Sequence, residues 1–93
     1  MKIRLYNFLF RSLGQKELLL SQPSDVRELL DYLSETFGEK VDKWLWKGTG
    51  KDRTLIAGTM ILVNGRHVCH LNGLDTPLMD DDTVSIFPPA GGG

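Results

Sequence analysis

Hydrophobic and polar side chains alternate at the start of the chain, where Ile3, Leu5 and Leu9 alternate with Lys2, Arg4 and Tyr6. A period of two is typical of a half-buried strand, so residues 1–10 are predicted to form one. Residues 12–15 are then expected to turn. The short apolar run of residues 17–20 is expected to pair antiparallel with the first strand as a hairpin.

A helix is predicted between Ser24 and Gly38. Ser24 is a good N-cap residue, and Gly38 stands where a glycine commonly follows the last helical turn. The apolar residues between them follow the i, i+3, i+4, i+7, i+11 spacing of one buried stripe. They are Val26, Leu29, Leu30, Leu33 and Phe37. This stripe is expected to pack on the sheet.

The second half of the chain predicts further strands. Residues 59–63 are a near-continuous apolar run typical of a sheet interior, and Asn64-Gly65 is a strong hairpin signal. Residues 66–69 are therefore expected to return antiparallel. After a looped crossing and an acidic turn, residues 83–87 are predicted to form the last strand.

Residues 39–57 show no clear pattern. Trp44 and Trp46 stand close together, either as core packing or as an anchor for a partner, and residues 48–53 are a polar, glycine-rich stretch typical of a loop. With this segment unassigned, the predicted order is two strands, one helix and three strands. Such an order indicates an α+β fold.

Size and charge limit the function. The 93 residues are enough for one domain with one core, but too few for a catalytic cleft with a separate lid. Eleven basic and twelve acidic residues are interspersed, so we expect no nucleic acid partner. Apolar runs fall short of the roughly 18 residues of a membrane span, so we expect no membrane partner. The single cysteine, Cys69, cannot form an internal disulfide, which favours the cytoplasm.

Three potential metal ligands occur together near the Asn-Gly turn. On a strand, His67 and Cys69 would share a face while His70 would point the other way, so we expect no metal site. Cys69 is accordingly interpreted as an ordinary, half-buried thiol.

The last seven residues are Phe87, Pro88, Pro89, Ala90, Gly91, Gly92 and Gly93. The two prolines fix φ and hold the root of this segment extended, whereas glycine has no Cβ and can lie extended in a narrow tunnel. The four residues after the prolines reach about 13 Å at ~3.3 Å per residue. We therefore expect a folded domain over residues 1–89 and a flexible tail over residues 90–93, which presents the carboxylate of Gly93 to a partner's active site.

Three segments in the last third of the chain form a combined signature. They are Ile-Leu-Val-Asn-Gly-Arg at 61–66, His-Leu-Asn-Gly-Leu-Asp-Thr-Pro-Leu at 70–78 and Asp-Asp-Asp-Thr-Val-Ser-Ile-Phe-Pro-Pro at 80–89. Together with the closing Gly92-Gly93, they resemble the MoaD/ThiS family of ubiquitin-like sulfur carriers, and the MoaD branch most closely. The resemblance implies a ubiquitin-like β-grasp fold: a mixed sheet with one main helix packed across it and a flexible C-terminal glycine tail.

The resemblance also implies a function. The carboxylate of Gly93 would be adenylated and converted to a thiocarboxylate that donates sulfur, most plausibly in molybdopterin (Mo/W cofactor) biosynthesis. The family's partners are an E1-like adenylating enzyme of the MoeB/ThiF type, a MoaE-type large subunit and a persulfide sulfur donor. Residues 87–92 would form the tail and its partner-binding root, and Phe87 in particular is expected to contact the partner.

ATP and magnesium are expected to come from the activating enzyme. Residues 48–52 have neither the spacing nor the hydroxyl residue of a phosphate-binding loop, so the chain itself supplies no nucleotide site. The protein would thus be a carrier and substrate, as the small subunit of a molybdopterin synthase-type complex, without catalytic machinery of its own.

Three alternatives remain open. A thiocarboxylate can equally serve thiamine or tRNA thiolation, and the same carboxylate can be joined to lysines by a ubiquitin-like protein modifier. The third alternative is a β-grasp interaction domain without chemistry, for which the glycines are incidental.

Overall fold

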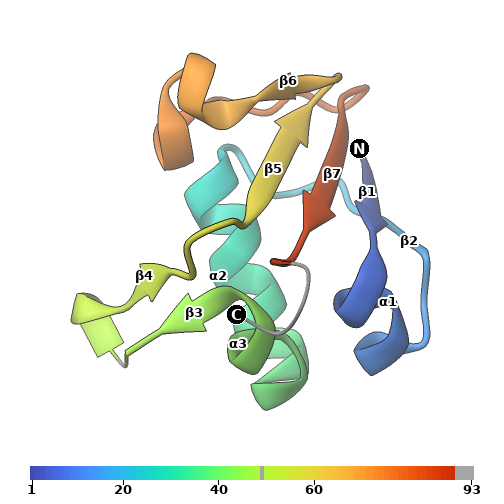
Figure 1. Cartoon of the computed structure of the whole chain (residues 1–93). Helices are drawn as coiled ribbons and strands as arrows, with labels where there is room; N and C mark the ends of the chain where they lie inside the picture. The colour runs from blue at the N-terminus through green and yellow to red at the C-terminus, as the bar shows by residue number, and fades with distance from the viewer. Residues whose placement is uncertain (49, 90–93) are drawn as a thin grey trace.

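The computed structural model describes residues 1–48 and 50–89, apart from the side chain of residue 51. Its main element is a five-stranded mixed sheet with the order β2-β1-β7-β5-β6, in which β1 and β7 are parallel and the other neighbours antiparallel (Figure 1). The strands are β1 (Lys2–Leu5), β2 (Glu17–Leu19), β5 (Met60–Val63), β6 (Arg66–His67) and β7 (Thr83–Phe87).

The main helix, α2 (Val26–Phe37), crosses one face of this sheet, as predicted (Figure 1). The first four residues of the predicted stripe are fully buried, and Phe37 is half-buried against them. The expected N-cap is wrong by one residue. Asp25 caps the helix, because its carboxylate accepts a hydrogen bond from the Glu28 amide at 2.8 Å, whereas the Ser24 hydroxyl donates to the Glu28 carboxylate at 3.1 Å.

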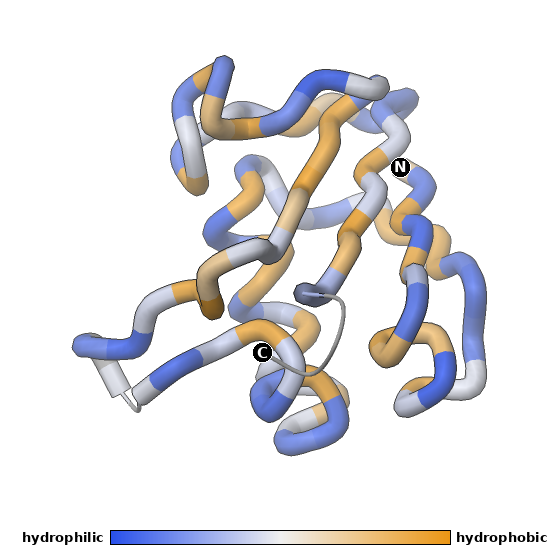
Figure 2. Tube along the Cα trace, in the orientation of Figure 1, coloured by the Kyte–Doolittle hydropathy of each residue, from blue (hydrophilic) through white to orange (hydrophobic). Residues whose placement is uncertain are grey.

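The core lies between α2 and the sheet. Alternate residues of the three central strands point toward the helix and are buried, as a half-buried sheet requires. They are Ile3, Leu5, Ile61, Val63, Val84 and Ile86. Figure 2 shows the continuous hydrophobic run of β5 in this layer. The predicted α+β arrangement, with a mixed sheet and one main helix packed across it, is confirmed.

The predicted ten-residue opening strand is wrong in its second half. Strand β1 ends at Leu5, and α1 (Asn7–Leu13) follows it. Asn7 begins the helix with a φ of +54°, which breaks the extended path, and Phe8 stacks on Trp44 with ring centroids 4.6 Å apart. Tertiary packing therefore selects the helix. The antiparallel pairing of β2 with β1 is confirmed, but a helix joins these strands in place of a tight turn.

The unassigned segment consists of α3 (Glu39–Leu45) followed by a small hairpin. Strands β3 (Trp46–Lys47) and β4 (Thr54–Leu55) pair antiparallel, and a 3₁₀ turn (Gly50–Asp52) lies between them. The loop predicted for residues 48–53 is therefore mainly the connection of this hairpin.

The Asn-Gly hairpin between β5 and β6 is confirmed, since Asn64 and Gly65 have φ of +52° and +85°, the signs of a type I′ turn. The returning strand is shorter than predicted, because it ends at His67 and a 3₁₀ turn (Val68–His70) follows. Val68 enters the core there. Another 3₁₀ turn (Gly73–Asp75) precedes β7. Within the described residues, no helix has the length and apolar character to cross a membrane.

Candidate functional site at the root of the C-terminal segment

The segment predicted to carry the chemistry leaves the sheet from its central strand. Strand β7 lies between β1 and β5, with Ile86 opposite Leu5 on one side and opposite Ile61 on the other. The Tyr6 amide donates a hydrogen bond to the Ile86 carbonyl at 3.2 Å, just before the strand ends. Pairing on both sides fixes the position and direction at which the chain departs.

Phe87 is half-buried on the sheet face opposite α2, as the alternation with the buried Val84 and Ile86 requires. Its ring stacks on Tyr6 with centroids 4.2 Å apart and an interplanar angle of 13°. Met60 lies directly opposite Phe87 on β5 and is 41% exposed. The root is therefore flanked by an apolar strip, consisting of Tyr6, Phe87 and Met60, on the sheet face opposite α2.

Pro88 and Pro89 are buried, so the root is packed onto the domain. A Cβ added to Gly58 would lie 3.5 Å from the Cβ of Pro89, and Gly58 has a φ of +94°. This distance is an ordinary van der Waals contact, so it is the positive φ, which glycine adopts without strain, that favours glycine here. Residues Ala90, Gly91, Gly92 and Gly93 lie outside the described residues. Their predicted roles, and the flexible tail over residues 90–93, stay predictions.

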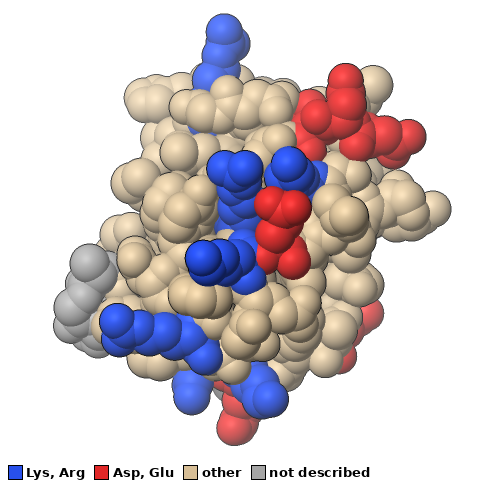
Figure 3. Space-filling view, turned by 90° about the vertical axis from the view of Figure 1, so that its right-hand side faces the viewer, with Lys and Arg blue, Asp and Glu red and all other residues tan. Residues whose placement is uncertain are grey.

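Charged side chains lie beyond the apolar strip. Arg4 on β1 and Glu17 on β2 form an ion pair at 3.7 Å on the same face of the sheet. Figure 3, which views the side of β1, β2 and α1, shows several basic side chains around an acidic one. Exposed pairs of this kind contribute little to stability.

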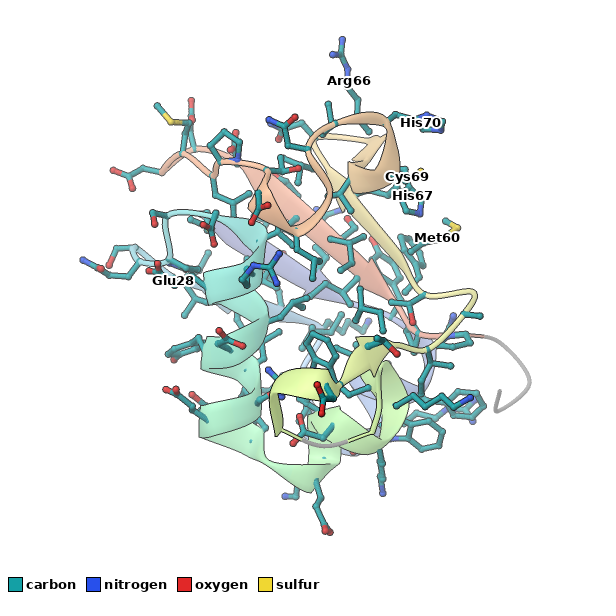
Figure 4. The ribbon with its side chains drawn as sticks, turned by 90° about the vertical axis from the view of Figure 1, so that its left-hand side faces the viewer. Glu28, Met60, Arg66, His67, Cys69 and His70 are labelled. Atoms are coloured by element: carbon teal, nitrogen blue, oxygen red, sulfur yellow. The ribbon has the colours of Figure 1, made fainter. Side chains whose placement is uncertain are left out.

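The potential metal ligands lie on the β6 end of the molecule (Figure 4). Cys69 is exposed, so its interpretation as a half-buried thiol is wrong, because a 3₁₀ turn replaces the expected strand there. The His67 imidazole accepts a hydrogen bond from the Cys69 amide at 3.0 Å through Nδ1. In the part of the chain that the structure describes, no three His, Cys, Asp or Glu residues could hold a metal ion.

A groove of about 630 Å³ lies beside the root and was not predicted from the sequence. We call it the tryptophan groove. Its lining residues come from α3, the β3–β4 hairpin, the segment after that hairpin and the root: Lys43, Trp44, Trp46, Lys47, Thr54, Leu55, Ile56, Ala57 and Pro89. The only available signal was the pair of tryptophans flanked by lysines in residues 43–47.

Together, the mixed sheet, the crossing helix and the central last strand define a ubiquitin-like β-grasp protein. A model of the ThiS family matches residues 3–93, and the chain belongs to this family. The predicted MoaD/ThiS membership is confirmed, while the preference for the MoaD branch stays a prediction.

Two relatives are archaeal proteins. A candidate sulfur carrier protein of Archaeoglobus fulgidus is 34% identical over 83 residues, which cover 88% of this chain and 90% of that protein. Small archaeal modifier protein 3 of Haloferax volcanii is 58% identical over 33 residues. That match covers 36% of each protein, so it spans about a third of the modifier's length.

Two solved structures extend the comparison. The small archaeal modifier protein 1 of Methanosarcina acetivorans has a TM-score of 0.83 at 32% identity, covering 99% of this chain and 94% of that one. A candidate subunit 1 of molybdopterin converting factor from Pyrococcus furiosus has a TM-score of 0.70 at 26% identity, covering 96% and 95%. Both structures share the fold along almost the whole of this chain.

Proposed function

We propose that this protein is a sulfur carrier whose Gly93 carboxylate is adenylated and then converted to a thiocarboxylate. The observation that carries the proposal is the family match, which runs to residue 93, together with a central strand that ends in a packed root. To insert a carboxylate into another enzyme's active site, a carrier needs a fixed root and an end without side chains.

The chemistry balances in two displacement steps. A Gly93 carboxylate oxygen attacks the α-phosphorus of ATP, and pyrophosphate leaves. A sulfur nucleophile then attacks the carbonyl carbon, and AMP leaves, because an acyl-adenylate is a far better electrophile than a free carboxylate. When the nucleophile is a persulfide, the product is an acyl disulfide; a second thiol then breaks its S–S bond and forms a disulfide with the donor's sulfur, which leaves sulfur in place of one carboxylate oxygen.

The adenylating machinery belongs to a partner in this proposal. An E1-like enzyme of the MoeB/ThiF type would supply ATP and magnesium, and a persulfide donor would supply sulfur. The apolar strip and the packed root give such an enzyme a rigid surface to hold while the end of the chain enters its active site.

The preferred sulfur acceptor is the molybdopterin precursor, bound by a MoaE-type large subunit. The similarity to the Pyrococcus furiosus protein, whose name refers to molybdopterin conversion, supports this choice. The second candidate is a ubiquitin-like protein modifier, which the similarity to two small archaeal modifier proteins favours. Both candidates use the same activated carboxylate and differ in the nucleophile that receives it.

The test is incubation of the protein with ATP, magnesium, a sulfide donor and a MoeB/ThiF-type enzyme from the same source, followed by intact-mass analysis. Replacement of oxygen by sulfur adds about 16 Da. A variant without Gly93 is expected to keep its fold and to gain no mass. If neither protein gains mass with a competent enzyme, the carrier proposal is wrong. Conjugates of higher mass in cells, absent for the Gly93 deletion, would favour the modifier.

A further inference from the structure

The tryptophan groove carries positive charge without compensation from its own walls. Its nine lining residues include Lys43 and Lys47, both exposed, and no aspartate or glutamate. Trp44, Trp46 and Leu55 provide apolar walls between and beside the two lysines. The groove therefore suits an apolar side chain that is flanked by carboxylates.

Each tryptophan ring of the groove packs against another side chain. Trp44 stacks on Phe8, and Trp46 lies under the guanidinium of Arg53 at 4.0 Å, so each ring is supported from outside the groove. Among the described residues, neither indole nitrogen has a hydrogen-bond partner.

The groove is continuous with the root through Pro89, which belongs to both. The four residues beyond Pro89 span at most about 13 Å. An enzyme that reaches Gly93 must therefore bring its active-site rim within that distance of Pro89, which is itself a wall of the groove. The groove therefore lies close to any protein that binds the C-terminal end of the chain.

The chain's own last four residues are a poor occupant. They carry no apolar side chain larger than the methyl group of Ala90. One exposed ion pair between the Gly93 carboxylate and a lysine would not offset the conformational entropy lost on ordering four residues.

We propose that the tryptophan groove is a docking site for the adenylating enzyme, and that it takes an apolar side chain of that enzyme flanked by acidic residues. This inference rests on the proposed function. We assign the groove to the adenylating enzyme because this enzyme must bind the carrier first. Every later sulfur acceptor meets a carrier whose terminal carboxylate has already been activated.

The experiment measures the rate of pyrophosphate release at varied carrier concentration with a MoeB/ThiF-type enzyme from the same source. The variant K43E/K47E replaces both groove lysines. The matched control is K40E/R66E, which makes the same change in net charge at two exposed positions outside the groove. Figure 4 shows Arg66 pointing outward at the far end of the molecule. Circular dichroism checks that both variants fold.

We expect the KM of K43E/K47E to rise roughly tenfold with kcat unchanged, since two attractive ion pairs become repulsive. The control is expected to stay within about twofold of the original KM. A second variant, A57W, fills the groove without a change in charge and is expected to raise KM as well. The KM of the unmodified protein should also increase with salt more steeply than that of K43E/K47E.

Equal KM values for K43E/K47E and K40E/R66E would overturn the docking proposal, and so would a dimer of the protein that K43E/K47E dissociates. Failure of the proposed function can be distinguished from failure of the docking proposal. If the proposed function is wrong, the enzyme releases no pyrophosphate even with the unmodified protein. In that case, calorimetric titration of the same enzyme with the Gly93-deleted protein and its K43E/K47E form still decides whether the groove binds it.

Discussion

The side chain of Arg53 is expected to make the main polar contacts that hold the β3–β4 hairpin against α2. Its substitution therefore tests this account of the fold. Its guanidinium donates to the Asp31 carboxylate at 2.7 Å and to the Ser34 hydroxyl at 3.2 Å, and lies 4.0 Å from the centre of the Trp46 ring. The side chain is 23% exposed, so solvent screens these contacts only in part.

The magnitude follows from these contacts. The hydrogen bond to Ser34 is worth about 1 kcal/mol, the cation–π contact about 0.5–1 kcal/mol, and the pair with the half-exposed Asp31 up to about 1 kcal/mol. Since the contacts share one group, they are not fully additive. We expect R53M, which keeps most of the apolar stem, to lose about 2 kcal/mol of unfolding free energy.

The assay is urea denaturation followed by tryptophan fluorescence, with R27M as the matched control. Arg27 also pairs with a carboxylate, that of Asp75 at 3.2 Å, but its side chain is 56% exposed, so its removal should cost less than about 1 kcal/mol. With a slope of about 1 kcal/mol per molar urea, the midpoint of R53M should fall by about 2 M. Equal losses for R53M and R27M would refute the reasoning.

Further substitutions test the root, the core and the helix cap. G58A should lower the unfolding free energy by about 1–2 kcal/mol, because alanine at a φ of +94° is strained, and thermal unfolding should show a fall of about 5–10 °C; an unchanged melting temperature would contradict the positive φ of Gly58. L33A should cost about 2–5 kcal/mol in urea, since Leu33 is fully buried between α2 and the sheet, and a loss below 1 kcal/mol would place it outside the core. D25A should cost about 1 kcal/mol and more than S24A, and the reverse order would mean that Ser24 is the cap after all.

The parts of the fold that were predictable are those in which local pattern and tertiary packing agree. The first four residues of the α2 stripe are its buried residues and Phe37 is half-buried, and the alternation of β1 and β7 matches the burial of every second side chain. The Asn64-Gly65 turn was predictable because it requires two positive φ angles, which asparagine and glycine tolerate best.

The errors lie where distant contacts decide the local structure. The run Phe8-Leu9-Phe10 is too short to distinguish a strand from a helix. Its helical form depends on the burial of Leu9 and on the stack of Phe8 with Trp44, 36 positions later in the chain. The same reason hid α3 and the small hairpin. Helix α3 packs against α1 and α2, and Arg53 of the hairpin contacts α2, so neither element follows a period of its own.

The candidate site was predictable only in part. Phe87 ends the last strand and the two prolines follow it, but the burial of both prolines depends on tertiary packing and was not visible in the sequence. The tryptophan groove was missed because its walls come from three separate stretches of the chain, which are residues 43–47, residues 54–57 and Pro89. The two lysines of the groove are adjacent to the tryptophans in sequence. They form part of a groove only because the fold places Pro89 beside these residues.

The measurement that tests the central claim most directly is fragmentation of the C-terminal tryptic peptide after incubation with the adenylating enzyme. The chain has no lysine or arginine after Arg66, so trypsin releases residues 67–93 as one peptide. This peptide contains Met79, whose oxidation also adds about 16 Da, so mass alone is ambiguous. Fragments that begin at Pro88 contain neither methionine nor cysteine. The account predicts that these fragments carry the added mass; a gain confined to fragments that contain Met79 would contradict it.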